Sequence, residues 1–405
     1  MKRFFLSSIA LVMAVTACTE SGLIDAPEFY GKSIVFDTYI GKAPMTKAES
    51  IEISNLENSV TGARMYAFKA DKGKANKDNV DYSSAYLDGR LVKSSGIWNY
   101  QTYKNNAWGN EDAYMPSEKD LAFIAYNSDA LGCMSYDVTD VTNFDFTVKD
   151  NMADQVDLLV TPFTFVTETG ETTTVPLRFY HLLSRIGFKL MTTGGNTQVT
   201  IHTLKLHGRF VKSGHVNMTL ATATPNTNPE SDESINITRV PSIYPNKEGS
   251  NAYVNYYDFL GTGNSFQINS GSESTTQQIY INSNEPSNDK NCYLMLIPGQ
   301  VENLIDADDI DKDGNTTEYT ITPYIEVKYQ LGSSDPKTAK VSLEQTVGNV
   351  TQNWNFEAGK AYEFVFKITT AAIEFSGVVV NKWDGPEYYP EDDNSASGEN
   401  TTPQE

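Results

Sequence analysis

Three aspartates at alternate positions are the first residues whose type and spacing could do chemistry. Asp309, Asp311 and Asp313 are followed directly by Gly314. Alternating carboxylates can converge on one hard cation such as calcium, and the glycine allows the sharp turn of an EF-hand-like loop. The bidentate glutamate expected at the twelfth loop position is missing, because Thr320 stands there. A solvated acidic hairpin turn is therefore the preferred interpretation, with calcium as the alternative.

A second reactive position lies near the start of the chain, where Cys18 ends the stretch "VTAC". A basic start precedes an apolar run over 4–17, too short for a bilayer core of roughly 30 Å. This is the form of a secretory signal peptide, and its end resembles a bacterial lipobox. We predict a lipoprotein signal peptide over 1–17, cut between Ala17 and Cys18, with Cys18 lipidated. The alternative is a plain signal peptide with an incidental cysteine.

Lipidation would anchor the mature chain without a membrane-spanning segment. Each buried methylene adds about 0.8 kcal/mol, so two or more acyl chains bind stably. Thr19 stands where an aspartate would favour retention in the inner membrane, and this predicts anchoring in the outer membrane. Residues 18–32 are the expected tether.

Other candidate pairs have simple structural interpretations. His181 and Arg185 would need a helix to lie together, and no serine and aspartate complete a catalytic triad; we interpret them as flanking a buried strand. Cys133 and Cys292 could pair in an oxidising compartment or remain free buried thiols. No carboxylate pair is marked for glycosidase chemistry, so we expect no enzyme and no cofactor.

The charge balance restricts the partners. The chain has 31 Lys and Arg against 52 Asp and Glu, a formal net charge of -21. Nucleic-acid affinity depends on cationic contacts to phosphate, so we expect no nucleic-acid partner. With 4 histidines and 3 cysteines, the scattered ligands are too few for a structural zinc site.

Strand periodicity dominates the sequence, and only one short helix is expected, over 152–160, whose end could itself be a strand. Many short strands separated by Gly, Asn, Asp and Ser clusters predict β-sandwiches. Period-two runs of β-branched and aromatic residues predict half-buried antiparallel strands at 34–40, 199–210, 318–331, 361–370 and 372–383.

The length of 405 residues predicts about two domains. The polar segment 167–174 precedes a dense apolar block and is the expected boundary. It separates a first β-sandwich domain over 33–170 from a second over 171–384. Residues 385–405 are acidic and rich in Pro, Ser and Asn, which predicts a disordered tail.

Four stretches follow one another in order behind the lipobox. They are "IVFDTYIGKAPMTKAES" (34–50), "AYMPSEKDLAFIAYNS" (113–128), "DQVDLLV" (154–160) with "VPLRFYHLLSRIGFKL" (175–190), and "NFEAGKAYEFVFKITTAAIEFSGVVVNKW" (355–383). Together they resemble the fimbrillins of Bacteroidetes, lipoprotein pilins with Mfa-like relatives. The resemblance implies an all-β fold of two tandem transthyretin-like β-sandwich domains, and assembly into a surface fimbria that serves adhesion.

The resemblance also implies how subunits would join. A protease removes the leading segment, and a strand of another fimbrial subunit fills the exposed groove, which is β-strand addition. The expected removable strand runs from Ser33 to Ile40, with Ile34, Phe36 and Ile40 as the residues that fill the groove. The expected cleavage site is Lys47-Ala48.

One departure from the family pattern leaves the processing open. Polymerising pilins are typically cut after arginine, but this chain has no arginine between Arg3 and Arg64. Cleavage must then follow Lys47, or the chain stays uncut. An uncut chain would remain lipid-anchored and would suit a base, anchor or non-polymerising surface protein.

The alternative function is a surface lipoprotein that binds glycans. Trp98, Tyr100, Tyr103 and Trp108 cluster in "IWNYQTYKNNAW" and could offer stacking platforms. These rings are also explained as loop and core aromatics of a β protein.

Overall fold

The computed structural model of the protein describes residues 32–40, 62–73, 77–94, 97–137, 140–168, 170–192, 198–218, 222–225, 235–237, 242–249, 251–261, 263, 265–268, 276–278, 294–310, 316–347, 349–368 and 373–382.

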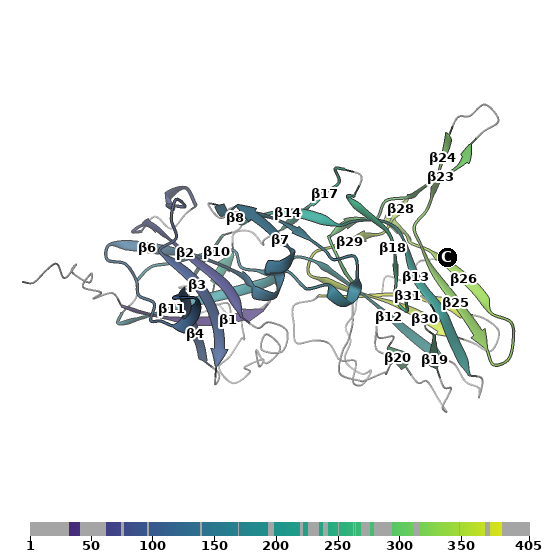
Figure 1. Cartoon of the computed structure of the whole chain (residues 1–405), viewed down its shortest axis with the longest axis horizontal. Helices are drawn as coiled ribbons and strands as arrows, with labels where there is room; N and C mark the ends of the chain where they lie inside the picture. The colour runs from purple at the N-terminus through teal and green to yellow at the C-terminus, as the bar shows by residue number, and fades with distance from the viewer. Residues whose placement is uncertain are drawn as a thin grey trace, which may run out of the picture.

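Strands make up nearly all regular structure in these residues, which confirms the all-β prediction. The predicted helix over 152–160 is a single 3-10 turn, η3 (Met152–Asp154), followed by the short strand β9 (Leu159–Val160). Two further 3-10 turns are η1 (Lys77–Asn79) and η2 (Ser128–Cys133). The molecule is elongated, with one group of sheets at each end (Figure 1).

The largest sheet has 11 strands in the described chain and contains most of the first half of the sequence. Its main path runs β1-β11-β9-β6-β2-β3-β4-β5, and β10, β15 and β16 branch from it. The strands are β1 (Ser33–Ile40), β2 (Ala63–Asp71), β3 (Leu87–Ser94), β4 (Ile97–Lys104), β5 (Ala107–Asn110), β6 (Lys119–Asn127), β9, β10 (Phe163–Val166), β11 (Thr172–His181), β15 (Thr222–Pro225) and β16 (Ile235–Ile237).

Strand β6 is buried on both faces. Its even-numbered side chains, such as Tyr126, pack in a core shared with Phe144 and Phe146 of a four-stranded sheet. Its odd-numbered side chains, such as Phe123, pack in a second core, which we call the β1 core because strand β1 contributes to it. A strand buried on both faces needs a continuous apolar run, which explains the sequence "LAFIAY".

The four-stranded sheet covers one face of the large sheet. Its order is β17-β14-β8-β7, and β14 pairs antiparallel with β8 from Ser213–Thr147 to Asn217–Asn143. The strands are β7 (Met134–Asp137), β8 (Asp140–Thr147), β14 (Ser213–Asn217) and β17 (Ile243–Asn246). Strands from 213–217 and 243–246 thus pack with the first half, and β11 (172–181) lies in the large sheet. The domain division at 170/171 stays a prediction.

Two five-stranded sheets share the core of the second half. Phe188, Phe364 and Phe366 from one sheet face Leu204, Ile325 and other apolar residues of the other sheet. The first sheet holds β12 (Ser184–Thr192), β20 (Thr276–Gln278), β21 (Leu294–Leu296), β30 (Lys360–Ile368) and β31 (Ile373–Lys382); the second holds β13 (Val199–Val211), β18 (Tyr253–Asp258), β19 (Phe266–Ile268), β25 (Tyr324–Leu331) and β26 (Lys337–Ser342).

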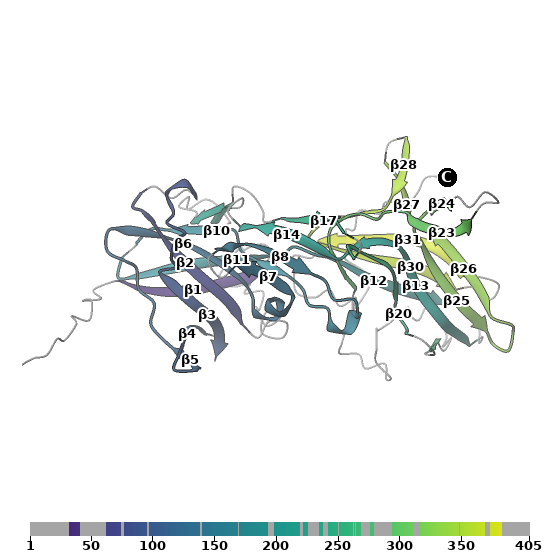
Figure 2. The same cartoon turned by 45° about the horizontal axis from the view of Figure 1, so that its top comes forward.

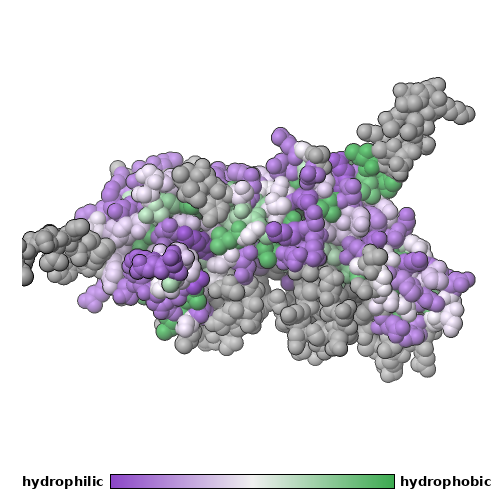
Figure 3. All heavy atoms as spheres, in the orientation of Figure 1, coloured by the Kyte–Doolittle hydropathy of each residue, from purple (hydrophilic) through white to green (hydrophobic). Residues whose placement is uncertain are grey.

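Three small two-stranded sheets complete the described strands. Two of them are hairpins that project from the second half (Figures 1 and 2). The viewed surface is mainly hydrophilic, and hydrophobic residues gather at the base of the β23–β24 hairpin (Figure 3), where Ile305 and Ile321 are exposed. The pairs are β22 (Gly299–Gln300) with β29 (Asn355–Phe356), β23 (Leu304–Ile310) with β24 (Thr316–Ile321), and β27 (Glu344–Val347) with β28 (Val350–Asn353).

The strand predictions differ from the structure in two respects. The run 318–331 is two strands, β24 and β25, because the chain turns at Thr322-Pro323. Antiparallel pairing was expected throughout, yet β1–β11, β10–β15 and β12–β30 are parallel. Their partners are far apart in sequence, so the intervening chain can make the crossover that parallel pairing needs.

We predict that Phe364→Ala lowers the free energy of unfolding by about 3–5 kcal/mol, because a fully buried ring leaves a cavity. Its ring contacts those of Phe188 and Trp354. The control is Val350→Ala at an exposed position, with an expected change of about 0.5 kcal/mol or less. Equal shifts of the urea midpoint in both variants would contradict this assignment of the core.

Candidate functional site

The candidate site is the groove at the edge of the large sheet that strand β1 fills. β1 pairs in parallel with β11, residue for residue from Ser33–Thr172 to Ile40–Phe179. It is the terminal strand on the main path of the sheet, as far as the structure describes it. Ser33 and Thr172 lie 139 residues apart in sequence. The strand is therefore a distant segment docked on a sheet edge.

Alternate side chains of β1 fill the β1 core. Ile34 and Phe36 are 9% and 6% exposed, whereas Val35 between them is 44% exposed. The Phe36 ring meets Phe123 of β6 edge-on, with 6.0 Å between ring centroids. Fully burying an apolar side chain of this size contributes about 1.5–3 kcal/mol. Docking of β1 thus depends on side chains that complete a core.

Hydrogen bonds fasten the start of β1 to the segment after β5. The Ile34 amide donates to the carbonyl of Ala113 at 2.8 Å, and the Met115 amide donates to the carbonyl of Lys32 at 3.0 Å. On the other side, the Lys32 ammonium lies 3.3 Å from the Glu168 carboxylate. The strand is therefore held at its beginning from two directions.

One polar side chain of β1 opposes docking. The Thr38 side chain is fully buried, and its hydroxyl has no hydrogen-bond partner among the described residues. A buried hydroxyl without a partner costs about 1–3 kcal/mol. Asp37, its neighbour, points away from the core and is exposed, although partial desolvation raises the pKa of its carboxyl. The docked strand therefore carries one unfavourable buried group among its apolar contacts.

The structure places the predicted groove residues as follows. Ile34 and Phe36 lie in the β1 core, and Ile40 lies opposite Phe179 in the strand register. Asp309 lies in β23 opposite Thr317, in an antiparallel hairpin rather than between two helices. The remaining predicted positions lie outside the described residues: Ala17, Cys18, Lys47, Ala48, Asp311, Asp313 and Cys292.

The contacts of His181, Arg185 and Cys133, which also stand out in the sequence, are those of residues that support the fold. His181 ends β11, and its Nδ1 lies 2.5 Å from the carboxylate of Asp157, which precedes β9. Arg185 lies near the start of β12 and is buried. Cys133 is a free, buried thiol whose pKa is raised by burial. No group of three or more His, Cys, Asp or Glu within the described ranges could hold a metal ion.

The four aromatic residues that cluster in the sequence 97–108 have different surroundings in the structure. Tyr100 and Tyr103 line a pocket beside β1. Trp108 packs on Tyr103 at 5.3 Å between ring centroids. Trp98 packs against the β1 core instead. A search for ligand contacts should therefore begin at the tyrosines, not at Trp98.

The comparisons with known proteins decide the family. The sequence profile described as Fimbrillin-like matches residues 66–383, well over half of the chain. The chain belongs to the fimbrillin-like family. This is a family of structural and adhesion proteins of the cell surface, not of enzymes.

Solved structures also resemble this fimbrillin-like protein. A fimbrial protein from Bacteroides vulgatus is 15% identical, with a TM-score of 0.47, over 87% of this chain and 99% of its own. A candidate cell adhesion protein from Bacteroides ovatus is 13% identical, with a TM-score of 0.45, over 87% and 98%. No curated protein matches the chain. Both TM-scores lie below 0.5, so the assignment rests on the family profile.

The described part of this fimbrillin-like protein was also searched for helices that could cross a membrane. Within those residues, none is both long enough and apolar enough to do so.

We predict that Phe36→Ala loosens β1, because it removes the ring between Phe123 and Tyr100. The backbone amides of 33–40 should exchange with deuterium at least tenfold faster, while the amides of β30 should be unaffected. Val35→Ala, the exposed neighbour in the same strand, is the matched control and should leave exchange near the wild-type rate. Equal acceleration by both variants would show that burial of Phe36 does not hold the strand.

Proposed function

We propose that this fimbrillin-like protein is made as a lipid-anchored surface precursor, which enters a fimbria when strand β1 is released and a strand of another subunit takes its place. The observation that carries the proposal is that β1 is a terminal strand whose apolar side chains complete a core. Removal of such a strand leaves both an unpaired edge on β11 and apolar pockets at the positions of Ile34 and Phe36. A strand of another subunit with the same alternation can fill both.

The proposed sequence of events begins at the lipid. Export follows cleavage between Ala17 and Cys18, and acylation of Cys18 anchors the chain in the outer membrane. Cleavage between Lys47 and Ala48 then frees the segment that carries β1. The buried, unpaired hydroxyl of Thr38 lowers the cost of releasing the strand.

Partners of the same or a related type follow from this mechanism. Other fimbrial subunits supply the incoming strand, and the assembled fimbria serves adhesion. We further propose that the two groups of sheets are tandem transthyretin-like β-sandwich domains. If Lys47 is not cut, the lipid remains attached and the protein acts as an anchor or accessory subunit.

We predict that Lys47→Ala, expressed in the native host, abolishes polymers on non-reducing gels and leaves a lipidated monomer in the outer membrane. Lys42-Ala43 repeats the same dipeptide five residues earlier, so Lys42→Ala is a matched control and should polymerise normally. Polymers formed equally well by Lys47→Ala would contradict processing at this site. Loss of polymers in both variants would also contradict it, because the effect would not be specific to Lys47.

A further inference from the structure

A pocket of about 610 Å³ opens where strands β3 and β4 part. The ladder between them runs from Ser94–Ile97 to Arg90–Gln101. Beyond it, the described residues 87–89 and 102–104 are not paired with each other, and β4 continues into a hairpin with β5. Asn105 and Asn106 have φ values of 52° and 62°, which suit a two-residue hairpin turn. The end of the β3–β4 ladder thus leaves a space that side chains line, and its volume lies within the range of small-molecule sites.

Four tyrosines line the pocket: Tyr86, Tyr100, Tyr103 and Tyr114. Tyr100 is nearly buried and lies against the Phe36 ring at 6.4 Å, so its position is fixed. Tyr103 is 58% exposed and available at the rim. Tyrosine offers a flat apolar face and a hydroxyl together. Burial raises the pKa of Tyr100 to about 12, so its phenol stays protonated at neutral pH.

Gly89 makes room for the Tyr100 ring. A Cβ at this position would lie 2.3 Å from Tyr100 Cε2 and 2.4 Å from the Gln101 carbonyl oxygen. Because one of these atoms belongs to the backbone, a side chain here would displace β4 itself. The absence of a side chain at residue 89 is therefore part of the pocket's construction.

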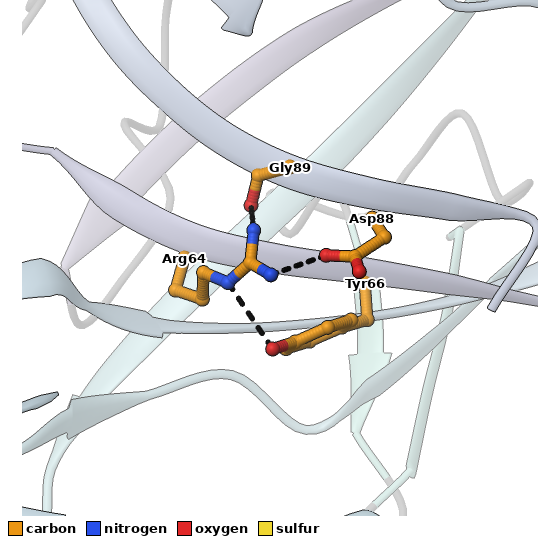
Figure 4. Close-up of polar contacts among 4 residues, drawn as sticks. All are labelled: Arg64, Tyr66, Asp88 and Gly89. Carbon is orange, nitrogen blue, oxygen red and sulfur yellow. Dashed lines mark hydrogen bonds and ion pairs between the residues drawn. The ribbon is translucent and has the colours of Figure 1, made fainter. Parts of the chain in front are cut away.

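The cations of the lining are already neutralised by carboxylates. Figure 4 shows the Arg64 guanidinium donating to the Gly89 carbonyl oxygen and the Tyr66 hydroxyl and pairing with Asp88. The Lys104 ammonium lies 2.6 Å from Glu111, which also accepts a hydrogen bond from the Thr102 hydroxyl.

This charge arrangement selects against anions and against purely apolar ligands. With Asp112, the lining holds three carboxylates against two cations. An anionic ligand would meet a small excess of negative charge, and a purely apolar ligand would strip water from five charged side chains without compensation. A neutral ligand rich in hydroxyl groups avoids both costs.

We propose that this pocket binds a short neutral saccharide. The C–H face of a sugar ring packs on the exposed ring of Tyr103, the buried Tyr100 fixes the wall beside it, and the sugar hydroxyls donate to the carboxylates of Glu111 and Asp88. The inference goes beyond strand exchange, because one chain supplies the whole pocket and no assembly is needed.

Strand β1 holds one wall of the pocket in place through backbone contacts. The Ala113 carbonyl that accepts the Ile34 amide lies between the lining residues Asp112 and Tyr114. Ser33 and Tyr114 also form a β-bridge. A wall fixed in this way lowers the entropic cost of binding. Whichever strand occupies the groove, the chain's own or a partner's, can supply the same brace.

Two assays test the proposal on the folded, soluble chain without its signal peptide. The first is binding to an array of neutral, sialylated and sulfated glycans. The second is saturation-transfer NMR with neutral monosaccharides at millimolar concentration. We expect binding to neutral glycans, weakened about tenfold or more by Tyr103→Ala and by Glu111→Gln. Tyr256→Ala is the matched control, because Tyr256 is also an exposed strand tyrosine, 52% accessible, outside the pocket. Its binding should equal that of the wild type.

Three results would overturn the proposal: no signal in either assay, binding confined to anionic glycans, or neutral-glycan binding that survives both pocket substitutions. Gly89→Ala gives an independent check, because it displaces Tyr100 without removing a polar group. It should also lose binding; a Gly89→Ala chain that is folded by circular dichroism and binds normally would count against the pocket geometry.

Discussion

The ring of Phe36 joins β1 to β4 and β6, two strands that lie far from it in the sequence. It lies between Phe123 of β6 and Tyr100 of β4, with ring centroids 6.0 and 6.4 Å away. Through this contact, docking of β1 closes the core on one face of the large sheet and fixes one wall of the neighbouring pocket. The apolar burial of this side chain therefore couples assembly of the chain, integrity of its core and the shape of a binding surface.

Double-sided burial of β6 explains how the fold could survive without β1. One face of β6 packs toward the four-stranded sheet through Tyr126 and its neighbours, and this core contains no residue of β1. The other face needs Ile34 and Phe36. Loss of β1 would open the second core while the first stays closed. A chain in this state presents an apolar groove on a scaffold that is still folded, as strand addition requires.

The sequence predicts the strands well and their partners poorly. β1, β13, β30 and β31 follow from period-two alternation. Even their β-bulges are visible in the sequence. The alternation of apolar residues shifts by one position between Ile201 and Leu204 and between Phe375 and Val378, where the strand registers shift.

The parallel pairing of β1 with β11 has no local signal in the sequence, because it depends on a contact between residues 139 positions apart. The pocket depends on where the β3–β4 ladder ends and on Gly89, neither of which the aromatic cluster alone could reveal. Trp98 packs against the β1 core and does not line the pocket.

In the proposed assembly, β1 leaves its own groove. Amino-terminal sequencing and intact mass of polymers purified from the native outer membrane test this step. We expect subunits that begin at Ala48 and lack residues 18–47, including Ser33–Ile40. Polymers in which every subunit keeps a lipidated Cys18 and an intact amino-terminal segment would contradict it.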